Sequence, residues 1–346
     1  MRQLINVNID AVDSLVSPER LYERIPVTEK AQATVRQART DIQNMINGTD
    51  NRCLLVVGPC SIHDTKAAMD YARRLSDIQQ KVSAKLMIVM RVYFEKPRTT
   101  IGWKGLINDP DMDGSCRVSK GLEIARELLR DINELGLPVG TEMLDPISPQ
   151  YTSDLVSWAS IGARTTESQT HREMASGLSM PVGFKNSTDG SLDVAVAAMQ
   201  ASKNPHTFIG LNHKGNVGVF RTKGNPYGHV ILRGGKKSSN YHPENIKQAV
   251  DDLTNNNLFD RVMVDCSHAN SGKKHEKQGE VLKNVIHQIT KGNRHILGLM
   301  LESNLNEGSQ KITDNMADLA YGVSVTDECI GWDRTVELID YAYNAL

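Results

Sequence analysis

The sequence has few cysteines and no long apolar run. Five cysteines in 346 residues are too few and too scattered for a disulfide framework, and no two of them form a CxxC pair. No apolar run approaches the roughly eighteen residues of a membrane span. Residues 1–16 alternate apolar and polar side chains and lack the apolar core of a signal peptide. We therefore expect a cytoplasmic protein with reduced thiols and no membrane partner.

The sequence also lacks an excess of charge of one sign. Its 40 basic and 41 acidic residues leave a formal net charge of −1. A balanced chain has no broad cationic surface for nucleic acid, so any binding site for anions must be local. The hydrophobic fraction of 39% and the charged fraction of 23% are typical of a globular protein with a sizeable core.

Eight short apolar segments are each predicted to be a buried strand. Segments with helical spacing of apolar residues alternate with them, which predicts parallel strands joined by crossover helices. We expect an α/β fold, a (β/α)8 TIM barrel. The predicted strands are 54–57, 87–90, 138–141, 158–163, 182–184, 230–232, 262–264 and 296–301. The predicted helices are 67–82, 122–135, 151–158, 170–178, 192–202, 243–255, 279–290 and 334–343.

The chain is longer than a plain barrel, which needs about 250 residues. Residues 1–50 are interpreted as an N-terminal extension with an extended piece and one or two helices, and residues 51–346 as the barrel. Two β-rich segments, 207–212 and 217–222, predict a β-hairpin inserted at 206–222, before the sixth strand.

Side chains suited to chemistry lie at or just beyond the predicted strand ends. They are Cys60, Arg91, Glu142, Arg164, Lys185, Arg233, His268 and Glu302. In a (β/α)8 barrel the active site collects at the carboxyl ends of the strands, so polar residues there indicate catalysis or ligand binding. The alternative is that strands simply end in polar residues at the surface, which suits one strand better than eight.

Positive charge is concentrated at the same ends, on Arg91, Lys96, Arg98, Arg164, Lys185 and Arg233. The planar fork of arginine matches carboxylate and phosphate oxygens, and lysine acts as a mobile point charge. Several such groups at one mouth indicate substrates with more than one anionic group. The alternative is pairing with the acids Glu95, Glu142 and Asp145, which we expect for one or two of the six cations.

A metal site is a second interpretation of the strand ends. Cys60, His268, Glu302 and, in the loop after the last strand, Asp327 offer one sulfur, one nitrogen and two carboxylates. This mixture suits Mn, Fe, Co or Zn better than Mg or Ca, which rarely accept thiolate. The alternative for Cys60 is a small apolar filler, which is the role that we expect for Cys266.

Several strings of residues are long enough to be compared with known families. They are GPCSIHD at 58–64, MRVYFEKPRTT at 90–100, GWKG at 102–105, GARTTESQ at 162–169, PVGFKN at 181–186, LRGGK at 232–236, SHAN at 267–270 and VTD at 325–327. From about residue 20 to the end, the sequence closely resembles 3-deoxy-D-arabino-heptulosonate 7-phosphate (DAHP) synthase of type I, the enterobacterial kind.

The resemblance implies an enzyme that condenses phosphoenolpyruvate with D-erythrose 4-phosphate, releases phosphate and opens the shikimate pathway to aromatic amino acids. It implies that the four metal ligands named above hold one divalent ion. It assigns phosphoenolpyruvate to Arg91, Arg164, Lys185, Arg233 and the backbone of Ala163, and erythrose 4-phosphate to Lys96, Pro97, Arg98 and Thr99. Lys96 is then expected to donate a hydrogen bond or proton to the aldehyde oxygen. Glu142 is expected to orient or deprotonate the attacking water or, alternatively, to form a structural ion pair.

Three other functions are weighed against this one. The related 3-deoxy-octulosonate 8-phosphate synthase uses arabinose 5-phosphate, but that family typically has Ala-Asn where this sequence has Pro97 and Arg98. A Schiff-base aldolase would use Lys185 as its nucleophile. A binding or regulatory barrel without activity would have lost metal ligands or cations, and the sequence keeps them all.

The resemblance also implies a homotetramer or homodimer and feedback inhibition by an aromatic amino acid, with tyrosine preferred over phenylalanine. The extension and the hairpin would build the subunit contact and the effector site. Matching positions are Asp145, Pro149, Gln150, Met174, Leu178, Ser179, Phe208 and Phe220. The alternative for the apolar ones is core packing. Cys329 is expected either to pack as filler or to approach Cys60 and form an inactivating disulfide when the metal is lost.

Overall fold

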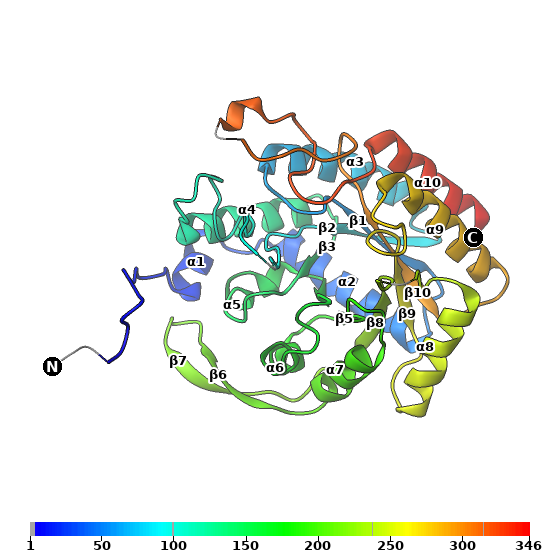
Figure 1. The fold of residues 1–346 in the computed structure, drawn as a ribbon, viewed down its shortest axis with the longest axis horizontal. Coiled ribbons are helices and arrows are strands. Elements are labelled where there is room, and N and C mark those ends of the chain that lie inside the picture. Colours follow the sequence, from blue (N-terminus) through cyan, green and yellow to red (C-terminus); the bar gives the residue numbers. More distant parts are fainter. Residues whose placement is uncertain (1–3, 99, 237, 314) are drawn as a thin grey trace.

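Parallel strands close into a barrel in the computed structural model, which describes residues 4–98, 100–236, 238–313 and 315–346 (Figure 1). The order around the barrel is β1-β10-β9-β8-β5-β4-β3-β2. The strands are β1 (Cys53–Gly58), β2 (Leu86–Arg91), β3 (Val139–Glu142), β4 (Trp158–Ile161), β5 (Val182–Lys185), β8 (Gly228–Leu232), β9 (Val262–Asp265) and β10 (Ile296–Glu302). The predicted TIM-barrel fold is confirmed.

Helices surround the strands (Figure 1). The long helices that follow β1 are α3 (Thr65–Val82), α4 (Val118–Glu134), α6 (Gln169–Gly177), α7 (Asp193–Lys203), α8 (Pro243–Asn255), α9 (Gln278–Thr290) and α10 (Trp332–Ala345). The single-turn elements are α5 (Pro149–Thr152), η1 (Ser153–Leu155), η2 (His275–Lys277) and η3 (Met316–Asp318). Local chemistry sets where they begin. Asp64, for example, caps α3, because its carboxylate accepts from the backbone N–H groups of Lys66 and Ala67. Among the described residues, no helix combines the length and apolar character that a membrane crossing requires.

Apolar side chains fill two layers of core. One cluster lies between the strands and the surrounding helices, and the other fills the interior of the barrel. The interior cluster includes Leu54 and Val56 of β1 and extends to Ala38, Ile42 and Met45 of α2 (Glu29–Asn47). One side of α2 therefore packs against the side chains that fill the barrel, at the end opposite the carboxyl ends of the strands.

The predicted helix at 151–158 is wrong. Its first part forms only the short turns α5 and η1, and its last residue belongs to β4. Side chains from distant elements bind the carbonyl oxygens that a longer helix would use. Arg126 Nη1 donates to Tyr151 O at 2.9 Å, and Asn133 Nδ2 donates to Leu155 O at 2.9 Å. Because side chains outside the segment already donate to these carbonyl groups, the segment does not need to continue as a helix to form their hydrogen bonds.

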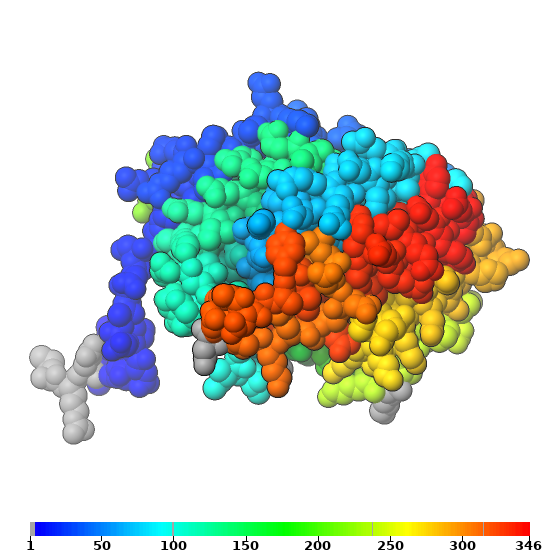
Figure 2. Space-filling view, turned by 90° about the horizontal axis from the view of Figure 1, so that it is seen from above, coloured from blue at the N-terminus to red at the C-terminus, as the bar shows by residue number. Residues whose placement is uncertain are grey.

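The N-terminal extension begins with a segment, 4–16, that has no regular secondary structure and projects from the body of the protein (Figure 2). It continues into α1 (Pro18–Arg24) and α2. Thr28 caps α2 by accepting from the Ala31 N–H at 3.2 Å. The helix ends at Gly48, whose φ of 80° is the left-handed conformation that favours glycine at this position.

The inserted hairpin is confirmed as β6 (Thr207–Leu211) and β7 (Val217–Arg221), an antiparallel pair outside the barrel. Near its base, the hydroxyl groups of Thr222 and of Ser176 in α6 lie 2.8 Å apart. At its tip, the His213 carbonyl accepts from the N–H of Glu19 in α1 at 2.8 Å. The hairpin thus links the α6 side of the barrel to the N-terminal extension, as Figure 1 shows.

Candidate active site

A cavity of about 120 Å³ opens at the carboxyl ends of the strands. Most of the predicted substrate residues line it, together with two of the four predicted metal ligands, His268 and Asp327. The lining residues are Lys96, Pro97, Arg98, Glu142, Gly162, Ala163, Arg164, Lys185, Thr188, Arg233, His268, Thr326 and Asp327. Three larger cavities, of about 180, 510 and 650 Å³, contain none of the predicted substrate or metal residues. The chemistry of the lining, rather than the size of the cavity, therefore identifies the candidate site.

Arg91, at the end of β2, is buried beneath this cavity. Its Nη2 donates to Glu302 Oε1 at 3.1 Å, and its guanidinium stacks 3.8 Å from the centre of the Tyr93 ring. Nη2 and Nε also donate to the carbonyl oxygens of Cys60 and Pro59, each at 3.3 Å. Its Nη1 is buried without a partner among the described residues. A buried donor of this kind is suited to an anionic ligand.

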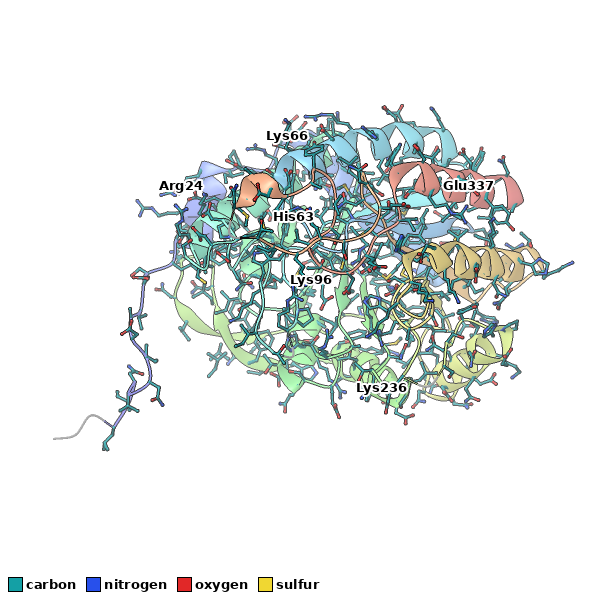
Figure 3. All side chains as sticks on the ribbon, turned by 45° about the horizontal axis from the view of Figure 1, so that its top comes forward. Arg24, His63, Lys66, Lys96, Lys236 and Glu337 are labelled. Atoms are coloured by element: carbon teal, nitrogen blue, oxygen red, sulfur yellow. The ribbon has the colours of Figure 1, made fainter. Side chains whose placement is uncertain are left out.

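Lys96 lies in the loop that follows β2, in the middle of the molecule, whereas Lys236 lies at its edge (Figure 3). The Lys96 Nζ is 3.2 Å from both the carbonyl oxygen and the Sγ of Cys60. Burial alone would lower the pKa of Lys96, but Cys60 and Glu302 raise it above its ordinary value. Lys96 is therefore a protonated donor at neutral pH.

The loop that carries Lys96 is fixed at its base. The Lys96 N–H donates to the Lys104 carbonyl at 2.9 Å. Gly105 follows with a φ of 112°, and a Cβ there would lie 1.9 Å from the Phe94 carbonyl oxygen. Only glycine allows this close approach of two backbone segments.

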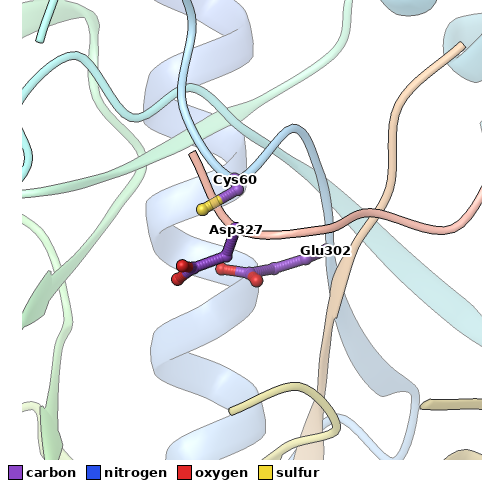
Figure 4. A group of neighbouring side chains, drawn as sticks. All are labelled: Cys60, Glu302 and Asp327. Carbon is purple, nitrogen blue, oxygen red and sulfur yellow. The ribbon is translucent and has the colours of Figure 1, made fainter. Parts of the chain in front are cut away.

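Cys60, Glu302 and Asp327 converge (Figure 4). Lys96 adjoins them through its contact with the Cys60 Sγ. One ligand atom from each lies within 4.8 Å of the other two. Glu302 ends β10, and the backbone there exchanges two hydrogen bonds with the Gln278 side chain, at 2.8 and 2.9 Å. Burial and then Glu302 raise the pKa of the Cys60 thiol to about 11. A thiol and two carboxylates this close together form a donor set that fits a divalent transition ion, whose charge would favour the thiolate.

His268, the fourth predicted ligand, lines the same cavity but is not part of that group of three. Its Nδ1 lies 2.9 Å from Asp265 Oδ2 and 2.8 Å from Ser267 Oγ. Its φ of 55° is in the left-handed region, which is uncommon outside glycine. The backbone is therefore held in a less favourable conformation that fixes the direction of the ring.

Lys185 and Glu142 do not form the ion pairs that the sequence analysis gave as an alternative. The Lys185 Nζ binds Asp265 Oδ2 at 3.0 Å. Glu142 is buried, and no cation lies within ion-pair distance of it in the described ranges of the chain. Its Oε1 has no hydrogen-bond partner there either. Glu142 is thus a buried carboxylate at the cavity wall, and the alternative of a structural ion pair is not what the structure has.

The remaining predicted substrate residues also meet at the cavity. Arg98 and Arg164 are exposed at its mouth, Arg233 is partly buried, and Pro97 and Ala163 complete the lining. The Arg98 Nε donates to the Trp103 carbonyl at 2.8 Å, which holds the loop over the cavity. Thr99 lies outside the described residues.

The eight predicted regulatory positions fall on three connected segments, and none of them lines the candidate active-site cavity as described. His171 of α6 contacts the Leu144 carbonyl at 2.7 Å, which links α6 to the loop before α5. The segments are the α5 region with Asp145, Pro149 and Gln150, the end of α6 with Met174, Leu178 and Ser179, and the hairpin with Phe208 and Phe220. The last two rings stack with their centres 5.7 Å apart.

All five cysteines are free thiols, and Cys116 alone of them is exposed. Cys266 is buried in the apolar cluster outside the barrel, so its expected role as a filler is confirmed. Cys329 is also buried. Its disulfide with Cys60 stays a prediction.

Two residues that support the site were given no role by the sequence analysis. Gln278 fixes the backbone of Glu302, and Asp265 joins Lys185 to His268. Asp265 carried one signal, because it directly follows the apolar segment 262–264 at a strand end. Gln278 carried none, since its partner lies 24 residues away along the chain.

Known proteins resemble this chain over nearly its full length. The model of the DAHP synthetase I family matches residues 24–340. The chain belongs to that family. A relative from Salmonella typhimurium, named "Phospho-2-dehydro-3-deoxyheptonate aldolase, Tyr-sensitive", is 54% identical over 97% of this chain and 94% of its own length. A relative from Escherichia coli with the same name but "Trp-sensitive" is 50% identical over 97% of this chain and 96% of its own length.

Solved structures extend the agreement to the fold of this member of the DAHP synthetase I family. The structure of phospho-2-dehydro-3-deoxyheptonate aldolase from Francisella tularensis matches with a TM-score of 0.95 and 47% sequence identity. The match covers 98% of both chains. The family and the barrel predicted from the sequence motifs are both confirmed.

Proposed function

We propose that this DAHP synthase family member condenses phosphoenolpyruvate with D-erythrose 4-phosphate to give DAHP and inorganic phosphate, the first step of the shikimate pathway. The observation that carries the proposal is that a cluster of candidate metal ligands adjoins a cavity lined by cations. The Cys60, Glu302 and Asp327 cluster adjoins Lys96, and the cations of the cavity lie around it. A metal ligand set beside a cationic cavity suits two phosphorylated substrates and an aldehyde that must be polarised.

Phosphoenolpyruvate would be held through its phosphate and carboxylate by Arg91, Arg164, Lys185 and Arg233, with the backbone of Ala163. The Nη1 of Arg91, which has no partner among the described residues, supports this assignment. Erythrose 4-phosphate would be held by 96–99, where the exposed Arg98 guanidinium is suited to a phosphate at the mouth. Holding two like-charged substrates together is a large part of the catalysis that these cations offer.

Cys60, Glu302 and Asp327 would hold one divalent ion, Mn, Fe, Co or Zn, and His268 would complete the set through its Nε2. The sulfur and carboxylate donors, within 4.8 Å of one another, support this assignment. When bound, the ion supplies a Lewis acid for the negative charge that develops on the aldehyde oxygen.

Two protein groups would handle protons. Lys96 is protonated and adjoins the metal cluster, so it would donate to the aldehyde oxygen as the new carbon–carbon bond forms. Attack leaves positive character on the former enol carbon, and water then adds there before phosphate departs. Glu142 would orient or deprotonate that water, because its carboxylate is at the cavity wall with one oxygen unpartnered in the described chain.

A Schiff-base mechanism at Lys185 is disfavoured by its surroundings. Burial alone would lower the pKa of Lys185, but Asp265 raises it above the ordinary value. A lysine nucleophile needs the opposite shift, to be neutral when it attacks.

An aromatic amino acid is the proposed feedback effector, with tyrosine preferred. The relative with 54% identity is named Tyr-sensitive, and the eight positions lie on three segments that hydrogen bonds link and that do not line the described cavity. Residues 1–50 and the hairpin 206–222 would make the contacts of a homotetramer or homodimer. Exposed apolar side chains on the tail and hairpin, such as Leu4, Val12 and Ile209, support that assignment. A cytoplasmic location fits a biosynthetic enzyme of this kind.

The deciding experiment follows loss of phosphoenolpyruvate with erythrose 4-phosphate or arabinose 5-phosphate, with and without EDTA. Consumption with erythrose 4-phosphate alone, abolished by EDTA and restored by Mn²⁺, is the expected result. Adding each aromatic amino acid to the active mixture identifies the effector. Turnover of arabinose 5-phosphate would move the protein to the octulosonate synthases, and no turnover of either after metal reconstitution would favour a binding role.

A further inference from the structure

One carboxylate joins the two halves of the candidate active site. Asp265, at the end of β9, is 0% exposed. Its Oδ2 accepts from Lys185 Nζ at 3.0 Å and lies 2.9 Å from His268 Nδ1. Its Oδ1 accepts from the backbone N–H of Ser267 at 3.0 Å and from the Ser267 hydroxyl at 2.6 Å. A cation of the substrate cavity and a proposed metal ligand therefore share a single oxygen atom.

The chemistry of this contact requires a carboxylate. An ionised aspartate only accepts hydrogen bonds and offers both oxygens, whereas asparagine offers one oxygen and turns two N–H donors toward its neighbours. Lys185 and Asp265 are both buried, so each charge depends on the other for its stability. If the Lys185 ammonium moves away from Asp265, the negative charge of the carboxylate acts more strongly on the His268 ring.

We propose that Asp265 is a positioning residue that couples the substrate site to the metal site, an inference that rests on the proposed function. An anionic substrate group that attracts Lys185 weakens the Lys185–Asp265 bond. Asp265 then attracts the Nδ1–H of His268 more strongly, in competition with Ser267 Oγ at 2.8 Å from the same nitrogen, which makes Nε2 a better metal ligand. By linkage, metal on His268 favours substrate on Lys185 to the same extent.

The test is a double-mutant cycle on metal-free protein without substrate. The dissociation constant for Mn²⁺ is measured by titration calorimetry for the wild type, Asp265→Asn, Lys185→Met and the double variant. Asp265→Asn is expected to weaken Mn²⁺ binding by about 10- to 100-fold, the usual effect of losing a carboxylate behind a histidine ligand. Lys185→Met is expected to tighten Mn²⁺ binding at least several-fold more in the wild-type background than in the Asp265→Asn background.

The comparison of backgrounds separates the proposed coupling from simple charge repulsion. Removing the Lys185 charge helps a nearby cation by direct electrostatics in both backgrounds alike, whereas the route through Asp265 exists in one only. Equal effects of Lys185→Met in the two backgrounds overturn the proposal. Cys266→Ala is the matched control, because this neighbour is also 0% exposed but packs in the apolar cluster outside the barrel. It is expected to keep the wild-type affinity for Mn²⁺.

A second variant covers the case in which Asp265→Asn does not fold. Asp265→Glu keeps the charge for Lys185 but moves the carboxylate by one methylene group relative to the His268 ring. Weakened Mn²⁺ binding with a wild-type thermal midpoint is expected, and unchanged Mn²⁺ binding overturns the proposal. The turnover assay of the wild type is read separately. If the wild type shows no turnover but the cycle is non-additive, the proposed function is rejected and the coupling is kept. If the wild type shows turnover but the cycle is additive, the function is kept and the coupling is rejected.

Discussion

The strand ends and the peripheral region, by which we mean the tail 4–16 with the hairpin β6–β7, are built in opposite ways. At the strand ends, charged groups are buried: Arg91 is 1% exposed and Glu302 is 2% exposed. In the peripheral region, apolar groups are exposed: Leu4 is 91% exposed and Ile209 is 78% exposed. Each arrangement is unfavourable for an isolated chain in water.

The difference indicates what each region contacts. Buried charges are retained at the strand ends because they hold one another and leave a few groups unpartnered within the described chain, such as Arg91 Nη1 and Glu142 Oε1, for small polar ligands. Exposed apolar side chains become favourable only when another apolar surface covers them. The strand ends are thus suited to chemistry, and the peripheral region to association.

The largest expected effect comes from removing the proposed metal ligand Cys60 at the strand ends. A second buried cysteine, Cys266, is the matched control. Cys60→Ala should reduce kcat/KM by about a thousandfold or more, since a lost Lewis acid removes several kcal/mol of stabilisation. Cys266→Ala, in the outer apolar cluster, should retain kcat/KM within a few-fold. The measurement is initial rate with Mn²⁺, together with bound metal by atomic absorption. Equal losses in the two variants would show that Cys60 matters only for packing.

Glu142 sharpens the comparison, because it is a buried charge with no ion pair to maintain within the described ranges. Glu142→Gln should lower kcat by about 10²- to 10⁴-fold, the usual contribution of a general acid or base, while the KM for phosphoenolpyruvate changes little. Glu127→Gln, on the exposed side of α4, is the control and should keep the wild-type kcat. If Glu142→Gln instead raised KM and left kcat intact, the carboxylate would serve binding rather than proton transfer.

Much of the barrel and of its site was accessible from the sequence because both follow from local patterns. Each barrel strand is a short apolar run, and a chain of such runs with helices between them has few possible folds. The barrel then brings strand ends together, which is why Cys60, Glu302 and Asp327 meet although they are far apart in sequence. Recognition of the family motifs added the roles of individual residues.

What the sequence did not reveal depends on contacts between distant segments. The short turns at 149–155 exist because Arg126 and Asn133 bind carbonyl groups that a longer helix would have used. Asp265 joins two partners at one oxygen: Lys185 comes from β5, and His268 comes from the turn that follows β9. No pattern within one segment specifies such a meeting.

Glu95, a buried acid in the loop after β2, tests through pH what the burial of charge at the strand ends costs. It precedes Lys96, and the hydroxyl of Ser148, just before α5, donates to its Oε2 at 2.8 Å. Burial, opposed by that hydrogen bond and reinforced by Asp145, raises the pKa of Glu95 from 4.5 to about 8. The folded protein therefore holds a proton that the unfolded chain releases. The stability from that proton is fully present below pH 4.5 and is lost as the pH rises to about 8.

Glu95→Gln removes this dependence, since an amide does not titrate. The free energy of unfolding by urea, measured at pH 5, 6.5 and 8, should fall with pH in the wild type relative to the variant, by an amount on the order of a few kcal/mol. Parallel curves for the two proteins would mean that the folded state does not raise the pKa of Glu95.

The smallest expected effect on catalysis is in the peripheral region, where the prediction is a change of association without a change of rate. Ile209→Ser combined with Val219→Ser removes two exposed apolar side chains, 78% and 59% exposed, from the hairpin. If another subunit covers them, each loss costs about 1.5–3 kcal/mol of association, so light scattering at micromolar protein should detect smaller particles. The control is Ile101→Ser, which removes a fully exposed isoleucine from the loop that follows Lys96 and should leave the particle mass unchanged.

Without effector, kcat of the hairpin variant should stay within about twofold of wild type, because no hairpin residue lines the described cavity. A large fall in kcat with unchanged mass would instead make the hairpin part of the catalytic unit, and the contrast between the two regions would no longer hold.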